Sequence, residues 1–399
     1  MSNQKHQIVI IGGGSAGLSI ASDLCYNHSH RSFDVTIIEP SEKHYYQPLW
    51  SLVGAGVFPK EESQRNQADF TPYNAKWIKD KVATFTPEQN KVTLESGQEV
   101  NYDYLIVAPG IQLNWHEIKG LKETLGKNGV CSNYAYDMAE YTWENIKSIK
   151  SGNAIFTQPA MPIKCAGAPQ KICYMAEDHF TKKNLRKNID VIFAAQGPRI
   201  FGVEKYRFAL EKVVKRKGIN TLFEHNLIEV KGEDREAIFE NVVTKEKVTM
   251  KFEMLHVVPP MGPPDFIKKS PLASKEGGWV DVDKDTCQHV RYPNIFSAGD
   301  ASSLPTSKTG AAIRKQVPVL VKNLLDHIDG NLLKAKYNGY ASCPLLTGYG
   351  SVILAEFDYD GNPDESFPFD QAEERFSMYL LKLYGLPRLY WHGMLKGKA

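Results

Sequence analysis

The chain has 399 residues, 42% hydrophobic and 24% charged, which is ordinary for a folded protein of two or three domains and excludes wholesale disorder. A formal net charge of +2 gives no indication of a nucleic-acid partner, and the six cysteines have no zinc-like spacing, so we expect no metal site. Residues 1–7 are polar and no apolar run reaches 18 residues, so we expect a cytoplasmic protein without a signal peptide or membrane-spanning helix.

The predicted elements begin with a βαβ unit. An apolar strand at residues 8–11 leads through a glycine turn into a helix at about 16–25, and a second strand follows at 35–38. Next come a loop with short helices at 41–70, a small antiparallel sheet within 76–100 and a buried strand at 104–108.

A second α/β region starts near residue 152. Its elements are expected in this order: strand 153–156, helix 169–183, strand 189–193, helix 206–217 and β-structure within 227–258. The chain then returns through a strand at 294–298 and a helix at 308–327, and its last section has β character before a helix from about 369. We therefore predict an α/β fold with two Rossmann-like dinucleotide-binding domains. The domains are expected at residues 1–115 with 280–338, at 116–279 and at 339–399.

A dinucleotide fingerprint stands between the first strand and the first helix. In Gly12-x-Gly14-x-x-Gly17, the first glycine makes the turn, the second lets a pyrophosphate approach the backbone, and the third packs helix on strand. Ser15 and Ala16 lie between these glycines, at a helix N-terminus that favours an anion. Glu39 ends the second strand, where an acid accepts hydrogen bonds from a ribose.

Two further segments select FAD over NAD. The apolar strand from Asn294 ends in Gly299-Asp300, and it resembles the returning strand of two-domain flavoproteins, whose aspartate binds the ribityl chain. The segment that ends at Gly110 resembles the end of the crossover strand in the same class. Asp300 could instead be only a helix N-cap.

The second domain lacks a glycine turn after its first strand. Residues 157–169 carry prolines and bulky side chains that would block a pyrophosphate, so NAD(P)H is a poor electron donor. Cys165 stands in this loop, just before a predicted helix. The helix N-terminus, Lys164 and Lys171 would favour its thiolate, although a buried small cysteine is the simpler alternative.

The motif Pro162-Ile-Lys-Cys-Ala-Gly-Ala-Pro-Gln-Lys171 resembles that of the sulfide:quinone oxidoreductases, in the branch that includes the mitochondrial enzyme. The resemblance covers about residues 8–395. Matching segments are His44–Pro48, Gly110–Leu113, Leu304–Thr309, Ser342–Leu345, Ile353–Tyr359 and Phe367–Asp370.

The resemblance implies the residues of the site. Cys165 and Cys343 would form the redox pair, as a disulfide or with a bridging sulfur, while Cys131 is interpreted as structural. Gln47 would lie near the flavin, and Lys308 close to its ring. The glycines of the fingerprint with Ser15 and Ala16, and also Glu39, Gly110, Gly299 and Asp300, complete the expected FAD contacts.

The implied activity is oxidation of hydrogen sulfide, with electrons passing through the cysteines and FAD to a quinone. A small thiol or sulfite would take the sulfur. The leucines, aromatics and cations of residues 379–391 suit a peripheral membrane contact, or a helix packed on the core. A homodimer is an analogy only. The alternatives are a type II NADH:quinone oxidoreductase, a pyridine nucleotide–disulfide reductase and a flavin-bound persulfide carrier or sensor.

Overall fold

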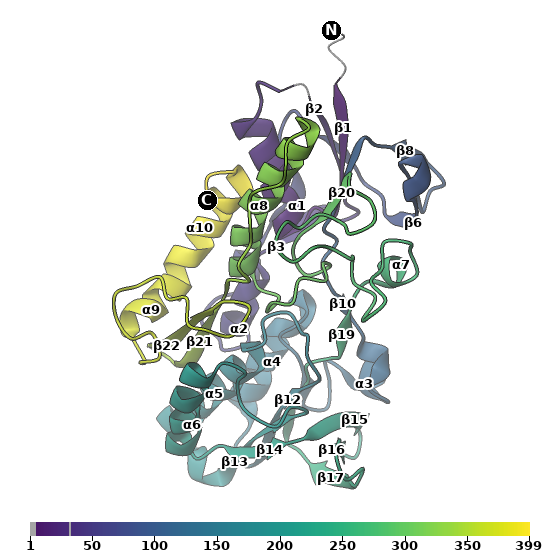
Figure 1. Cartoon of the computed structure of the whole chain (residues 1–399). Coiled ribbons are helices and arrows are strands. Elements are labelled where there is room, and N and C mark those ends of the chain that lie inside the picture. The colour runs from purple at the N-terminus through teal and green to yellow at the C-terminus, as the bar shows by residue number, and fades with distance from the viewer. Residues whose placement is uncertain (1–4, 32) are drawn as a thin grey trace.

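Two five-stranded parallel sheets organise the computed structural model, which describes residues 5–31 and 33–399 (Figure 1). In spatial order the strands of the first sheet are β20 (Ile295–Ser297), β9 (Tyr104–Val107), β1 (His6–Ile11), β2 (Phe33–Ile38) and β5 (Lys76–Ile78). Strands β20 and β9 and the second halves of β1 and β2 are largely apolar and buried, as parallel strands covered by helices must be, whereas the edge strand β5 is partly exposed. Helices α1 (Ser15–Ser22) and α8 (Gly310–Ile328) pack together beside this sheet.

The second sheet is also fully parallel and lies below the first in Figure 1. Its strands, in spatial order, are β11 (Val130–Cys131), β18 (Met254–His256), β12 (Gly152–Gln158), β13 (Ile189–Ala195) and β14 (Asn220–Phe223). Its helices are α4 (Tyr136–Ser148), α5 (Ala168–Lys182) and α6 (Glu204–Lys217). The two sheets confirm the predicted fold class, while the domain boundaries stay a prediction.

Short antiparallel elements surround the two sheets. They are β6 (Val82–Thr86), β7 (Lys91–Leu94) and β8 (Glu99–Asn101); β15 (His225–Lys231), β16 (Glu236–Asn241) and β17 (Lys247–Lys251); β3 (Lys43–Tyr45) with β4 (Gln64–Asn66); and β10 (Gln112–Leu113) with β19 (Met261–Gly262). The short helices are α2 (Trp50–Val53), α3 (Leu121–Thr124) and α7 (Asp265–Lys268).

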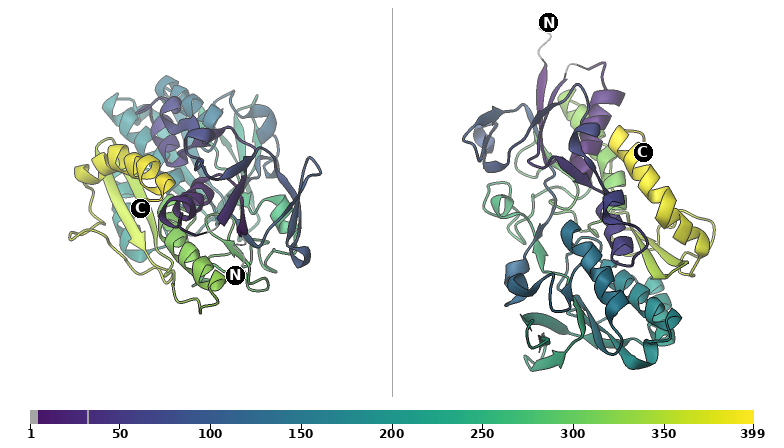
Figure 2. Two further views of the ribbon diagram at one scale, coloured as in Figure 1. Left: turned by 90° about the horizontal axis from the view of Figure 1, so that it is seen from above. Right: turned by 180° about the vertical axis from the view of Figure 1, so that it is seen from behind.

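The C-terminal section forms a hairpin and then a helical arm. Strands β21 (Ala341–Gly348) and β22 (Ser351–Phe357) pair antiparallel, and β21 contacts both α5 and α8. The arm consists of α9 (Phe376–Leu380), a π-helical turn (Leu381–Gly385) and α10 (Leu386–His392), and it runs along the first domain (Figure 2).

The arm starts later than the sequence indicates. The expected start near residue 369 is wrong because the preceding backbone is bound to the edge of β22. The amide of Leu354 donates to the carbonyl of Gln371, and the amide of Arg375 donates to the carbonyl of Val352. These bonds hold residues 371–375 in a turn that ends in an isolated bridge at Arg375, so the helix begins only at Phe376.

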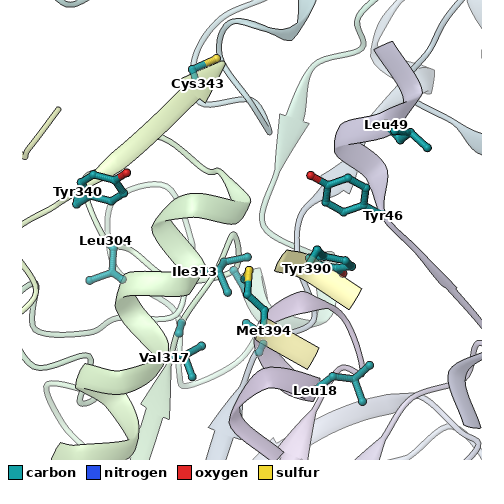
Figure 3. Packing of buried hydrophobic residues seen from close by; sticks show 14 of the residues in the cluster. Leu18, Tyr46, Leu49, Leu304, Ile313, Val317, Tyr340, Cys343, Tyr390 and Met394 are labelled. Carbon is teal, nitrogen blue, oxygen red and sulfur yellow. The ribbon is translucent and has the colours of Figure 1, made fainter. Parts of the chain in front are cut away.

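One apolar core joins both sheets to the C-terminal arm. Figure 3 shows where they meet: Met394 lies near Leu18 of α1, and the ring of Tyr390 lies beside that of Tyr46. The arm is therefore part of the folded body and packs against the domain that carries the glycine fingerprint.

Candidate active site

The three glycines of the fingerprint occupy the positions that their expected roles demand. Gly12 has φ +93°, and a Cβ there would lie 2.5 Å from the carbonyl oxygen of Ala108. A Cβ on Gly17 would lie 1.9 Å from the carbonyl oxygen of Gly12. A Cβ on Gly14, by contrast, would meet no protein atom within 4 Å. The loop thus needs glycine at positions 12 and 17 for its own packing, whereas position 14 leaves room for a ligand.

The N-terminus of α1 offers free donors beside that space. The first helical bond runs from the amide of Leu18 to the carbonyl of Gly14, and within residues 5–31 and 33–399 no side chain caps this end. The amides of Ser15 and Ala16 in the first turn therefore remain available to an anion. These donors and the room at Gly14 fit a pyrophosphate.

Glu39 lies behind the glycine loop, at the end of β2. Its carboxylate accepts hydrogen bonds from the amides of Gly13 and Ser41, each at 2.8 Å. Burial raises the pKa of Glu39, and the two amides oppose that rise. Part of the carboxylate is thus committed to the loop, and Glu39 also lines a cleft of about 760 Å³ that starts at Gly12.

The cleft runs from the glycine loop toward α7. It extends from the ends of β1 and β2 to the antiparallel sheet and to α7, where Phe85 stacks on Phe266 at a ring distance of 5.9 Å. Pro109 and Gln112, on either side of Gly110, also line it. Gly110 itself has φ +82°, and a Cβ there would meet no protein atom within 4 Å.

A buried charge cluster follows strand β20. Gly299, with φ +76°, and Asp300 line a small cavity with Lys308. Burial raises the pKa of Asp300, while Lys308 and Lys164 act to lower it. Burial lowers the pKa of Lys308 to about 8, and Asp300 opposes that shift. The ammonium of Lys308 donates to the carbonyl of Ser302 at 3.1 Å.

Lys164 contacts Gln47 and Trp50. Its ammonium donates to Oε1 of Gln47 at 2.7 Å and lies 5.0 Å above the ring of Trp50. Burial lowers its pKa to about 8, with Asp300 as the opposing influence. The largest causes that shift the pKa of Cys165 are Cys343, burial and Lys171, and the effect of Lys164 on this thiolate stays a prediction.

The fold brings two distant cysteines into contact. Cys165 lies before α5 and Cys343 lies in β21, and their Sγ atoms are 3.7 Å apart. The separation exceeds the roughly 2.05 Å of a disulfide, so the two sulfurs are in contact without a bond between them. A Cβ on Gly167 would lie 2.6 Å from Sγ of Cys343, so only glycine lets the loop before α5 approach β21 this closely.

The pKa values of the two thiols are shifted in opposite directions. The contact with Cys343 is the largest cause that lowers the pKa of Cys165, ahead of the cation of Lys171. The same contact and burial raise the pKa of Cys343 well above its usual value. The ammonium of Lys171 donates to Sγ of Cys165 at 3.1 Å. The lower pKa of the pair is thus on Cys165, the direction that Lys171 and its place before a helix lead one to expect.

The backbone of Cys165 is also unusual. Its φ of +54° is in the left-handed region, where a non-glycine residue is strained, and its amide donates to the carbonyl of Lys308 at 2.8 Å. The strained turn thus fixes the thiolate next to the segment that carries Lys308.

Sequence reasoning missed two groups near the sulfurs. Lys382 of the C-terminal arm is only 2% exposed and donates to the carbonyl of Pro48 at 3.0 Å. Burial and then the charge of Lys171 lower its pKa to about 7, and both sulfurs raise it. The buried hydroxyl of Tyr134 has no hydrogen-bond partner in the described part of the chain. Burial, and then the two cysteines, raise its pKa. Neither Lys382 nor Tyr134 has a sequence motif that marks it.

The two parallel sheets, the glycine fingerprint and the paired cysteines define a two-domain flavoprotein oxidoreductase. The pyridine nucleotide-disulphide oxidoreductase family matches residues 6–158. The solved structure of the sulfide:quinone oxidoreductase from Aquifex aeolicus superimposes with a TM-score of 0.84 at 18% identity, over 98% of this chain and 92% of that one. This likeness confirms the fold.

Sequence relatives then give the family. The mitochondrial sulfide:quinone oxidoreductase of Dictyostelium discoideum is 52% identical over 98% of this chain and 86% of that protein. The one of Mus musculus is 45% identical over 99% of this chain and 88% of that protein. The chain belongs to the sulfide:quinone oxidoreductase family, as its motifs indicate, and it is an FAD-dependent oxidoreductase. The expected cytoplasmic location stays a prediction.

Proposed function

We propose that the chain oxidises sulfide at the Cys165–Cys343 pair and delivers the electrons through FAD to a quinone. The contact that carries this proposal is the 3.7 Å approach of two sulfurs 178 positions apart. The buried ammonium of Lys171 beside them suits an anionic substrate such as HS⁻ and the thiolate that its attack releases. Family membership supports sulfide and quinone as the two substrates.

The sulfur chemistry balances within the pair. HS⁻ attacks the sulfur of Cys343 in the oxidised pair, the bond to Cys165 breaks, and Cys165 leaves as a thiolate while Cys343 becomes a persulfide. A thiol or sulfite then takes the outer sulfur and leaves Cys343 as a thiolate. The bond to Cys165 forms again when the pair loses two electrons. The low pKa of Cys165 supports it as the leaving group.

The cofactor would be held by residues from both ends of the first domain. The amides of Ser15 and Ala16, with Gly12, Gly14 and Gly17, would bind the pyrophosphate, Glu39 the ribose, and Asp300 the ribityl chain. Gln47, Gly110, Gly299 and Lys308 would complete the site. When bound, FAD supplies the two-electron acceptor that connects the pair to a quinone. The hydrogen bond from the amide of Cys165 to the carbonyl of Lys308 supports Cys165 as the cysteine that would face the flavin.

A membrane contact is proposed for the outer face of the C-terminal arm. Phe376, Leu380 and Tyr384 recur every four residues on this arm and are 61%, 42% and 63% exposed. The opposite face of the arm packs on the core. The arm is therefore amphipathic, and only its exposed face is available for a membrane contact. No described helix is long and apolar enough to cross a bilayer. Flotation of the protein with anionic vesicles, and its loss in Leu380→Asp, would test this contact. The homodimer stays a prediction.

Anaerobic titration of the purified yellow protein with sulfide tests the activity. We expect rapid flavin bleaching in the native chain and in Cys25→Ser, because burial raises the pKa of Cys25 to about 11 and it lies outside the site. Cys165→Ser and Cys343→Ser should not bleach. Rapid bleaching in both variants would refute the proposal, and bleaching by NADH would point to the NADH:quinone alternative.

A further inference from the structure

A buried chain of hydrogen bonds connects the C-terminal arm to the glycine loop. The hydroxyl of Tyr390, in α10, lies 2.5 Å from Nε2 of His44 and 2.8 Å from Oγ of Ser15. Nδ1 of His44 lies 3.1 Å from the carbonyl oxygen of Gly13 and 3.2 Å from Oε1 of Gln67. Residues from four separate segments thus meet at the loop.

The surroundings of His44 fix the direction of each hydrogen bond. Burial lowers the pKa of His44 to about 4, so its ring is neutral at physiological pH. Nδ1 faces two acceptors, the carbonyl of Gly13 and Oε1 of Gln67, and therefore carries the proton. Nε2 is then the acceptor for the hydroxyl of Tyr390, whose oxygen in turn accepts from Ser15. No alternative assignment satisfies all of these groups.

The same chain immobilises the peptide at Gly13. Its carbonyl accepts from Nε2 of Gln67 at 3.0 Å as well as from His44, and its amide donates to Glu39. Gln67 is 1% exposed and His44 is 4% exposed, so solvent cannot replace these partners. The hydroxyl of Ser15 is held on Tyr390, while its backbone amide stays free at the helix N-terminus.

Aromatic packing locks Tyr390 in place. Its ring lies beside that of Tyr46 (Figure 3), with 4.5 Å between the ring centres. The neighbouring ring of Trp391 lies 5.0 Å from Phe70. Tyr390 is 3% exposed. The outer residues of the same arm, by contrast, are the exposed ones. One short helical segment therefore has one face on the glycine loop and the other on solvent.

We infer that Tyr390 is a positioning residue for FAD: through His44 and Ser15, the docked C-terminal arm holds the glycine loop in the shape that binds the pyrophosphate. The inference rests on the proposed FAD site. If only a fraction of the molecules has the loop in its binding shape, the measured affinity for FAD falls in proportion to that fraction. Coupling between two equilibria is reciprocal, so FAD binding should favour docking of the arm by the same factor by which docking favours FAD binding. A change that weakens docking of the arm should therefore also weaken the binding of FAD.

Tyr390→Phe is the direct test, since it keeps the ring and removes only the hydroxyl. We expect the dissociation constant for FAD to rise about tenfold, which corresponds to a fall of the population with a docked arm to about a tenth. It would be measured by titrating deflavinated protein with FAD and following flavin fluorescence. Tyr73→Phe is the matched control, because Tyr73 is 88% exposed on the same domain. Equal dissociation constants in the three proteins would overturn the inference.

Hydrogen exchange of the native chain and of Tyr390→Phe provides a second test. FAD should slow exchange at residues 386–395, and this protection should be smaller in Tyr390→Phe. A merely structural role of Tyr390 predicts faster exchange in the variant with an unchanged effect of FAD, which would refute the coupling. Bleaching of the flavin by sulfide in the native holoenzyme is independent of both readouts. The proposed function and the role of Tyr390 can therefore be refuted separately.

Discussion

Replacing Lys171 by Met should raise the pKa of Cys165 and slow its chemistry. Lys171 is 2% exposed, and its ammonium lies 3.1 Å from the Cys165 sulfur. Burial lowers the pKa of Lys171, but the two sulfurs raise it by more, so the cation persists there. A hydrogen bond to a charged group contributes about 1.5–3 kcal/mol, which corresponds to a change on the order of 10- to 100-fold in the thiolate–thiol equilibrium.

The assay is alkylation of Cys165 by iodoacetamide in the reduced protein, followed by mass spectrometry over a range of pH. A thiol with a lowered pKa is still a thiolate at low pH, so the native chain should react there, and the profile of Lys171→Met should move to higher pH. Below both midpoints the rate should fall on the order of 10- to 100-fold.

Lys183→Met is the matched control, because Lys183 is exposed just after the same helix. If Lys171→Met alkylates at the native rate throughout, the cation does not hold the thiolate and the electrostatic account of the pair is wrong. A slower rate at every pH with an unmoved midpoint would show a loss of access and would equally contradict it.

Two glycine variants should separate ligand binding from folding. Gly14→Ala places its Cβ where no protein atom lies within 4 Å, so we expect native thermal stability with weakened FAD binding. The Cβ of Gly17→Ala, by contrast, meets the carbonyl of Gly12, so this variant should lower the melting temperature of the apoprotein. Normal FAD affinity in Gly14→Ala would contradict the pyrophosphate position. Lys382→Met should be more stable than the native chain at pH 7. Because the folded pKa of Lys382 is lowered to about 7, folding releases its proton between pH 7 and about 10, and native stability rises over that range. The difference in melting temperature should therefore shrink as the pH rises, and a constant difference would argue against a buried titrating lysine.

Local sequence was sufficient for the cofactor loop. The glycine spacing, the strand before it and Glu39 after it are neighbours along the chain, so turn geometry and periodicity predict them directly. The strained turn around Cys165 and its nearness to Lys171 are likewise local, since six residues separate them across the start of one helix. Resemblance to a family was needed to pair Cys165 with Cys343.

Tertiary structure alone decided which distant groups meet. Lys382 and Tyr390 belong to an amphipathic segment whose periodicity predicts a buried face but not its partner. The fold places Lys382 near enough to the sulfurs for them to raise its pKa, directs Tyr390 to the glycine loop, and pairs Lys164 with Gln47. The sequence by itself indicated the fold, the cofactor and the candidate redox cysteines, through local patterns together with resemblance to a family. Contacts over hundreds of residues depend on how whole elements pack, and no local pattern encodes that.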